Sequence, residues 1–236
     1  MIVSPHLDDA VMSLGATIAA QVRNGVDVSV ITVFAGNPDR LGPPSYWDAR
    51  RAVPTASEAI CQRRDEDLLA GKTLGVSVEW LPFDDAAYVS MRDPDAIWKC
   101  LEPTLSAADL ILLPGWPLKH PDHLWTTMLV QERVDPEKAV AYYVELPYAA
   151  RFVPFLKSLL RGRQSDAMHG HLKWARTATT APDRRAKEQA VAAYAGELAR
   201  LGYRARMAAL HDVFLRKEFV GYLDSQQLPW ALTLRR

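Results

Sequence analysis

Two short polar clusters carry the side chains of this chain that could do metal chemistry. Residues 4–9 read SPHLDD and follow an apolar run at residues 1–3, whereas residues 120–123 read HPDH and come after an apolar run at residues 110–113. Histidine and carboxylate side chains are common ligands of a catalytic zinc ion, which typically takes three of them and leaves one position open for water. The two clusters therefore predict a hydrolytic metal site.

The ligand types divide naturally between the clusters, and His6, Asp9 and His123 form one suitable set. Asp8 and Asp9 are adjacent at the turn into a helix and cannot easily both face one ion, so we expect one to ligate and the other to stay free. The free carboxylate is a natural general base for the water of the metal, whose pKa the ion lowers toward about 7. His120 lies beside His123 and could stabilise an oxyanion or protonate a leaving amine.

Each cluster also has a purely structural interpretation. Adjacent aspartates at the start of a helix often serve only as its N-cap and as partners of the helix dipole. An HPDH tetrapeptide is often a polar turn. Both clusters, however, follow strand-like runs, and ligands of open α/β sheets bind outside the carboxyl ends of the strands. We therefore favour a shared site over two unrelated turns.

The elements that must position these clusters alternate between strands and helices. Apolar runs typical of strands lie at residues 1–3, 26–34, 76–81, 110–113 and 139–144. Helical patterns lie at residues 9–24, 57–72, 94–105, 124–134, 183–201 and 207–226. This alternation predicts an α/β fold, Rossmann-like, with a mostly parallel sheet flanked by helices and a single domain over residues 1–236.

Two irregular stretches interrupt this pattern. Residues 35–55 are rich in proline and should form a long loop, which in a compact domain is often functional. Residues 162–182 are polar and basic and contain His169 and His171. Two histidines in a polar loop without nearby acidic ligands indicate solvated side chains more than a second metal site.

Composition narrows the class of partner. The 28 basic and 28 acidic residues give a formal net charge of +0, so no global field favours nucleic acid or an anionic membrane surface. We find no basic, apolar leader and no stretch of about 18 apolar residues, which predicts a cytoplasmic protein without a transmembrane segment. Cys61 and Cys100 fall in expected helices without a CxxC pair, which indicates reduced thiols. We expect a small-molecule partner.

Residues 4–10 (SPHLDDA), taken with residues 120–123 (HPDH), resemble the motifs of the LmbE-like or PIG-L family of metal-dependent N-deacetylases. Members of that family act on N-acetylglucosamine attached to inositol, phosphatidylinositol, malate or antibiotic aglycones. Further similarity lies at residues 63–67, 74–75, 85–88 and 145–149, and at Lys217, Tyr222, Ser225 and Gln226. The resemblance thus covers nearly the whole chain, and it implies hydrolysis of an N-acyl group, such as N-acetyl, from a small molecule that contains an amino sugar.

The resemblance also implies a role for each residue of the two clusters. It implies metal ligands at His6, Asp9 and His123, a general base at Asp8, and support of the oxyanion by His120. The ion implied is Zn²⁺, although two histidines and a carboxylate accept Fe²⁺ as well.

Two further residues take roles by the same resemblance. Arg63 and Asp85 become candidates for contacts with sugar hydroxyls, although Arg63 could equally be an exposed helix cation and Asp85 a simple turn residue. We expect Asp122 to orient a ligand histidine through its other ring nitrogen. Some family members place a tyrosine where this chain has Leu118, so here transition-state stabilisation would rest more on the metal and His120.

Two other functions remain open. His6, Asp8 and a distant His123 also satisfy the 2-His-1-carboxylate triad of Fe(II) oxygenases, although those that use 2-oxoglutarate have an antiparallel β-fold. A catalytically silent member of the family would bind a sugar without hydrolysis. Tyr46 and Trp47, in the long loop, either stack on a sugar ring or fix the loop to the core.

Overall fold

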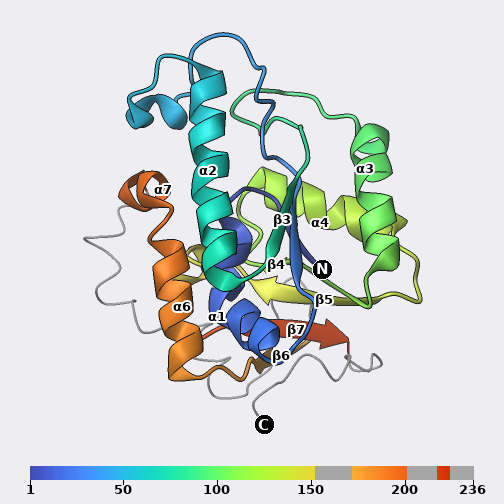
Figure 1. Ribbon diagram of the computed structural model, residues 1–236. Helices are drawn as coiled ribbons and strands as arrows, with labels where there is room; N and C mark the ends of the chain where they lie inside the picture. Colours follow the sequence, from blue (N-terminus) through green and yellow to red (C-terminus); the bar gives the residue numbers. More distant parts are fainter. Residues whose placement is uncertain (152–171, 201–216, 224–236) are drawn as a thin grey trace.

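The computed structural model describes residues 1–151, 172–200 and 217–223, and within them strands and helices alternate (Figure 1). The strands are β1 Ile2–Ser4, β2 Ser29–Thr32, β3 Ser77–Trp80, β4 Leu110–Trp116, β5 Ala139–Val144, β6 Leu172–Arg176 and β7 Phe219–Leu223. The helices are α1 Asp9–Arg23, α2 Ala56–Leu74, α3 Pro94–Ala107, α4 Pro121–Arg133, α6 Ala181–Val191 and α7 Ala195–Arg200, with 3-10 turns η1 Asp48–Arg51 and η2 Tyr148–Arg151.

The described strands form one sheet in the order β3-β2-β1-β4-β5-β7-β6. The pairings among β3, β2, β1, β4 and β5 are all parallel, whereas β7 runs antiparallel to both β5 and β6. The order of the sheet reverses between β1 and β4, and such a switch point is where open α/β sheets bind ligands. The two polar clusters follow these two strands, and the predicted fold class is confirmed.

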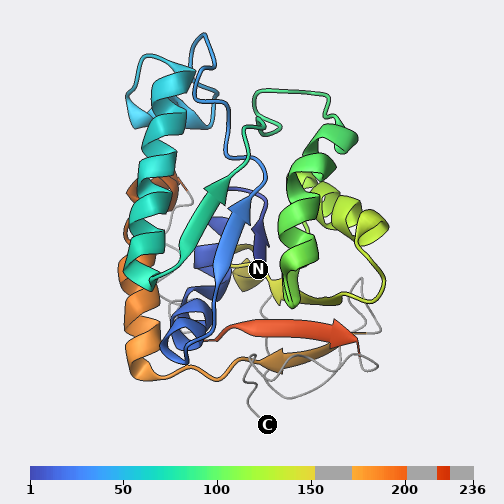
Figure 2. The same cartoon turned by 45° about the vertical axis from the view of Figure 1, so that its right-hand side comes forward.

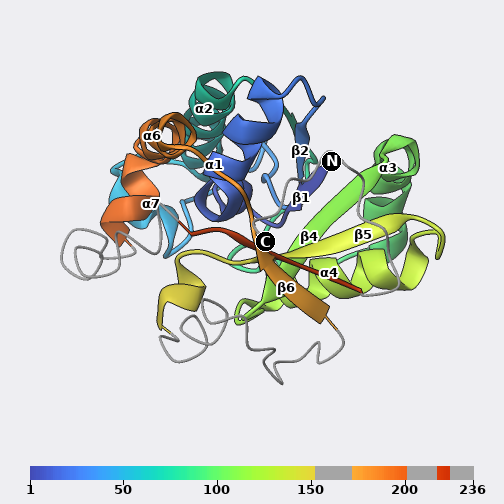
Figure 3. The same cartoon turned by 90° about the horizontal axis from the view of Figure 1, so that it is seen from below.

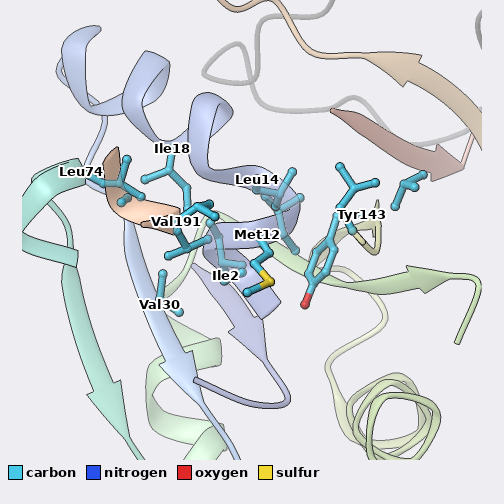
Figure 4. Packing of buried hydrophobic residues seen from close by; sticks show 14 of the residues in the cluster. Ile2, Met12, Leu14, Ile18, Val30, Leu74, Tyr143 and Val191 are labelled. Carbon is cyan, nitrogen blue, oxygen red and sulfur yellow. The ribbon is translucent and has the colours of Figure 1, made fainter. Parts of the chain in front are cut away.

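Helices cover both faces of the sheet (Figures 2 and 3). Successive strand residues point to opposite faces, so Ile2 packs with α1, α2 and α6 while Val3 packs with α3 and α4. Figure 4 shows the first of these cores, in which Ile2 and Val30 meet Leu14, Ile18, Leu74 and Val191. β1 is short, yet its three residues are all buried, which fixes the start of the first cluster.

Local capping explains where the helices that carry the site begin and end. α1 is followed by Gly25, whose φ of 78° is the left-handed conformation common after a helix. α4 begins inside the second cluster, because Nδ1 of His120 accepts a hydrogen bond from the backbone N–H of Asp122 and caps the helix. The helix therefore starts at Pro121 rather than at residue 124, and His123 lies in its first turn.

Two expectations about the second half of the chain are wrong where the structure describes it. β7 lies within the helix predicted at residues 207–226, and β6 lies within the irregular stretch predicted at residues 162–182. Both strands depend on each other, since Trp174 pairs with Gly221, and a Cβ at Gly221 would lie 2.9 Å from atoms of the Trp174 ring. Such long-range packing overrides local pattern.

The helix predicted at residues 183–201 is also wrong as a single element. It divides into α6 and α7, and Tyr194 lies between them, fully buried. Its hydroxyl donates to Oδ1 of Asp67 on α2 at 2.6 Å, so the break lets this residue face inward. Within the described ranges, no helix has the length and apolar character to cross a membrane.

Candidate metal centre

The candidate metal centre lies beyond the carboxyl ends of β1, β4 and β5. His6 follows β1 by two residues, Asp9 opens α1, and His123 lies in the first turn of α4, with all three side chains buried. Glu145 directly follows β5 and is buried beside them. Elements far apart in the sequence therefore bring the two polar clusters together.

Three ligand-type atoms form a nearly equilateral triangle. Nδ1 of His6 lies 3.2 Å from Oδ2 of Asp9 and 3.1 Å from Nε2 of His123. The third edge, from Nε2 of His123 to Oδ2 of Asp9, measures 3.0 Å. Three atoms bound to one ion at about 2.1 Å are expected to lie roughly 3.0 to 3.4 Å apart in octahedral or tetrahedral geometry. The triangle therefore has the dimensions of one face of a metal site.

The outer nitrogens of the two imidazoles are held by carboxylates. Nε2 of His6 lies 2.9 Å from Oδ2 of Asp122, and Nδ1 of His123 is hydrogen-bonded to Oε1 of Glu145. If each outer nitrogen donates its proton there, both inner nitrogens present lone pairs toward the carboxylate of Asp9. Three converging acceptors need a cation between them, and the carboxylate–histidine arrangement is the usual support of metal ligands. The donor set fits a divalent ion.

The electrostatics of the triangle favour positive charge. Burial opposes protonation of His6, but the hydrogen bonds that its ring donates to Asp122 and Asp9 outweigh this effect and raise the pKa of His6 to about 9. Burial also opposes protonation of His123, but Asp9 and Glu145 outweigh this effect and raise the pKa of His123 to about 10. Burial opposes ionisation of Asp9, yet the facing imidazoles of His123 and His6 lower its pKa. The surroundings thus stabilise a proton, and by the same field a metal ion.

Asp8 is adjacent to the triangle but is not one of its corners. It occupies the N-cap position of α1, where its side chain makes no capping hydrogen bond. Burial, with the charges of Asp9 and Glu197, raises the pKa of Asp8 to about 8, while Arg63 and His6 act in the opposite direction. The capping interpretation of this residue therefore has no hydrogen bond to support it.

His120 lies at the partly exposed edge of the same group. Its ring centroid is 4.8 Å from that of His6 and 5.0 Å from that of His123, and the three histidines each offer a ligand atom within 4.8 Å of the others. Because Nδ1 accepts from the backbone of Asp122, a neutral ring carries its proton on Nε2, which is then a donor. Burial and the two neighbouring histidines lower the pKa of His120 to about 4.

Arg63 and Asp85, the other two predicted site residues, contact each other. Nη1 of Arg63 lies 3.3 Å from Oδ2 of Asp85, and Nε lies 3.5 Å from Oε1 of Glu197. Arg63 is only 7% exposed, so the alternative of an exposed helix cation is wrong. Asp85 also accepts from the backbone N–H of Ala87, which makes it a turn residue as well as an ionic partner.

The long loop at residues 35–55 is joined to the loop between β3 and α3, and both lie above the carboxyl ends of the strands in Figure 2. Tyr88 links the two loops, since its hydroxyl accepts from the backbone N–H of Ser45 at 3.0 Å. Tyr46 is 77% exposed, whereas the indole of Trp47 donates to Glu197 at 2.9 Å. Trp47 therefore fixes the loop, whereas the side chain of Tyr46 is largely exposed. His169 and His171 lie outside the described residues.

Sequence reasoning missed two polar residues of the centre. Glu145 was noted only in a family-like block, although its position at the end of β5 obeys the rule that found the other clusters. Arg92 donates to Oδ1 of Asp122 from a loop with no recognisable motif. Leu118, where some relatives have tyrosine, contributes its backbone N–H to Oε2 of Glu145 at 2.6 Å.

Comparison with known proteins finds one family profile and several deacetylases that are similar to this chain. The profile of the PIG-L family, described as GlcNAc-PI de-N-acetylase, matches residues 1–134. A 2'-N-acetylparomamine deacetylase of Niallia circulans is 27% identical over 192 residues, which is 66% of this chain and 70% of that protein. The enzyme of the same name from Streptomyces fradiae is 26% identical over 171 residues, 64% of this chain and 58% of that protein.

The crystal structure of the A40926 pseudoaglycone deacetylase superposes with a TM-score of 0.73 at 26% identity, covering 97% of this chain and 98% of that one. Both polar clusters and the strands β1 to β4 lie within the 134 residues that the profile matches. The chain belongs to the PIG-L family.

Proposed function

We propose that this protein is a metal-dependent N-deacetylase that hydrolyses an N-acyl group, N-acetyl in the first instance, from a small molecule containing an amino sugar. The observation that carries the proposal is the triangle of acceptor atoms from His6, Asp9 and His123, with edges of 3.0 to 3.2 Å. Its mixed nitrogen and oxygen donors suit Zn²⁺, and also Fe²⁺. The deacetylase relatives support the reaction class.

His6, Asp9 and His123 would hold a divalent ion, which would supply Lewis acidity and lower the pKa of a nearby water. Asp8, which lies beside the triangle without a capping bond, accepts the proton of the attacking water and returns it to the leaving amine. The Nε2–H of His120 donates to the carbonyl oxygen as negative charge develops on it. Asp122 and Glu145 keep the two imidazoles directed at the triangle.

Arg63 and Asp85 bind the sugar in this proposal. Their ion pair lies on α2 and the β3–α3 loop, and Arg63 acts on the pKa of Asp8 as a nearby charge. A guanidinium and a carboxylate side by side offer donors and acceptors to neighbouring hydroxyls. The relatives that deacetylate N-acetylparomamine favour an N-acetylated amino sugar as the group bound here.

Two alternatives are less well supported. The oxygenase interpretation needs Asp8 as a ligand, whereas Oδ2 of Asp9 is the carboxylate oxygen that lies 3.0 Å from His123. The antiparallel fold of the 2-oxoglutarate oxygenases also differs from the mostly parallel sheet observed here. A silent sugar-binding protein would not need a free carboxylate, two supported imidazoles and a neutral histidine donor in one place, so this constellation favours catalysis.

The direct test is to incubate the Zn²⁺- or Fe²⁺-loaded protein with a panel of N-acetylated amino sugars, including N-acetylparomamine and N-acetylglucosaminyl inositol. We expect primary amine and acetate to appear in equal amounts, to cease after chelation and to return when metal is restored. Asp8→Asn, loaded with the same metal, is the matched control and should release both products at least about 100-fold more slowly. Binding of a sugar without any release across the panel would support the silent alternative instead.

A further inference from the structure

We propose that Arg92 is a positioning residue of the metal centre and acts on His6 through Asp122. This inference rests on the proposed metal site, since it assigns a role within it. Arg92 lies in the loop between β3 and α3, and its Nη2 donates to Oδ1 of Asp122. Asp122 in turn holds Nε2 of His6. Arg92 is thus two contacts away from the ligand atom.

The carboxylate of Asp122 is fully used by three partners. Oδ1 accepts from Arg92, while Oδ2 accepts from the backbone N–H of Ala86 at 3.1 Å and lies 2.9 Å from Nε2 of His6. Asp122 is fully buried, so water cannot easily replace a hydrogen-bond donor that the carboxylate loses. Two of its three bonds therefore come from the β3–α3 loop, and that loop sets the rotation of the carboxylate that orients His6.

Arg92 itself lies against two aromatic rings. Its guanidinium carbon lies 4.5 Å from the centroid of Phe34 and 5.3 Å from that of Trp125. Its side chain is only 13% exposed. A planar guanidinium can lie against rings and still donate from its edge, whereas a lysine ammonium cannot do both as well. The site therefore selects arginine by geometry as well as by charge.

The two ligand histidines differ in how their carboxylates are anchored. Glu145, which holds His123, receives a backbone N–H from Leu118 at 2.6 Å. Asp122 receives the cation of Arg92 in addition to a backbone N–H. Without that cation the buried anion of Asp122 would be left short of one strong partner, and it would be free to rotate away from His6. Loss of Arg92 should therefore weaken metal binding through misorientation of His6.

Metal affinity tests this inference without any measurement of turnover. Competition with a chromophoric chelator gives the Kd for Zn²⁺, and the visible bands of the Co²⁺-loaded protein report the coordination geometry. We expect Arg92→Met to weaken Zn²⁺ binding by roughly 10- to 100-fold, the range for loss of an outer partner of a metal ligand, and to shift the Co²⁺ bands. Arg92→Lys keeps the charge, so its Kd for Zn²⁺ should lie between those of Arg92→Met and the wild type.

Arg64→Met is the matched control, because Arg64 is also an arginine against a tryptophan, 5.4 Å from the ring of Trp80, and donates to the backbone oxygen of Ala35. It should keep its Kd within about two-fold, since it does not reach Asp122. When Asp122 is already replaced by asparagine, the further change Arg92→Met should raise the Kd for Zn²⁺ by less than about three-fold. Arg92 can then no longer act on His6 through the carboxylate of Asp122.

Unchanged Zn²⁺ affinity and Co²⁺ bands in Arg92→Met would overturn the inference. The inference would also be overturned if Arg92→Met weakened Zn²⁺ binding as much in the Asp122→Asn protein as in the wild type. That result would show that Arg92 acts through packing alone. If Arg92→Met does not fold, Arg92→Lys carries the test, and wild-type affinity in that variant would overturn it. Tight metal binding without amine release would instead refute only the deacetylase proposal.

Discussion

Each ligand histidine of the candidate centre lies between two carboxylates: one holds its outer nitrogen, and that of Asp9 lies 3.0 to 3.2 Å from its inner nitrogen. This arrangement separates the roles of the neighbours Asp8 and Asp9, since only Asp9 lies on the triangle. Two side chains of one type, adjacent in sequence, thus face different partners. Their variants should fail in different ways.

The first prediction concerns this adjacent pair. Asp8→Asn keeps the shape of the side chain but cannot accept a proton, so kcat should fall by about 100-fold or more while metal stays bound. Asp9→Asn replaces an anionic ligand with a neutral one and should lose metal affinity, with activity partly restored by excess Zn²⁺. Elemental analysis and turnover of both variants check this. If Asp8→Asn proved to be free of metal while Asp9→Asn kept its metal and its activity, Asp8 would be the ligand and Asp9 the base.

The second prediction concerns Glu145. Glu145→Gln should weaken Zn²⁺ binding by roughly 10- to 100-fold, because a neutral amide holds the outer nitrogen of His123 less strongly than a carboxylate does. Glu132→Gln, an exposed change on α4, should leave the Kd unaltered. Equal affinities in the two variants, measured by chelator competition, would show that Glu145 does not support the ligand.

The sequence was sufficient to find the two polar motifs that follow β1 and β4, and insufficient to find Glu145 after β5 or Arg92 in a loop. His6, Asp9 and His123 could be predicted because motif and strand end coincide. Arg92 could not, because its partner Asp122 lies on another element and its loop has no regular pattern. The pairing of Arg63 with Asp85 likewise joins a helix to a loop, and only the folded chain brings those two together.

At the scale of elements, a buried ion pair joins α6, β7 and α1. Nζ of Lys187 lies 2.6 Å from Oε1 of Glu218, and the same carboxylate accepts from the backbone N–H groups of Ala16 and Thr17. Lys187 is fully buried, and burial lowers its pKa while Glu218 opposes that shift. This contact fastens the antiparallel end of the sheet to the helix that begins at Asp9.

The third prediction follows from that pair. Lys187→Met should lower the free energy of unfolding by about 3 to 5 kcal/mol, because it leaves the buried charge of Glu218 without its cation. Arg133→Met removes the cation of an ion pair whose partner Asp95 is largely exposed, and it should cost about 1 kcal/mol or less. Urea unfolding of both variants checks the contrast, and similar losses would contradict it.

Strand prediction succeeded where the signal was local and failed where it was not. The run at residues 139–144 became β5 with the same bounds, because its six residues are apolar or aromatic throughout. β6 and β7 each have five residues and depend on the seating of Trp174 against Gly221 and Gly115. That contact leaves no periodic pattern in the sequence, so the sequence alone favoured a helix at residues 207–226 and a loop at residues 162–182.

At the scale of the whole molecule, one buried acid should make stability depend on pH. Burial raises the pKa of Asp67 to about 6, although hydrogen bonds from Tyr194 and Trp80 act against this shift. Between about pH 4 and 6 the folded protein therefore holds a proton that the unfolded chain has released. The contribution of this proton to stability is complete below about pH 4 and is lost as the pH rises through about 6.

The fourth prediction compares wild type with Asp67→Asn, which cannot titrate. The difference in unfolding free energy, wild type minus variant, should fall by about 3 kcal/mol between pH 4 and pH 7, at about 1.4 kcal/mol per pKa unit. Urea unfolding at several pH values measures it, and other titrating groups cancel in the difference. A difference that stays constant or rises with pH would contradict the raised pKa of Asp67.

The central claim is that His6, Asp9 and His123 hold one metal ion, and its most direct test is anomalous diffraction from crystals of the zinc-loaded protein. The account predicts one strong peak at about 2.0 to 2.2 Å from Nδ1 of His6, Oδ2 of Asp9 and Nε2 of His123, with Asp8 and His120 facing the open side. A peak bound by His6, His120 and His123 with Asp9 turned away, or no peak at the triangle, would contradict it.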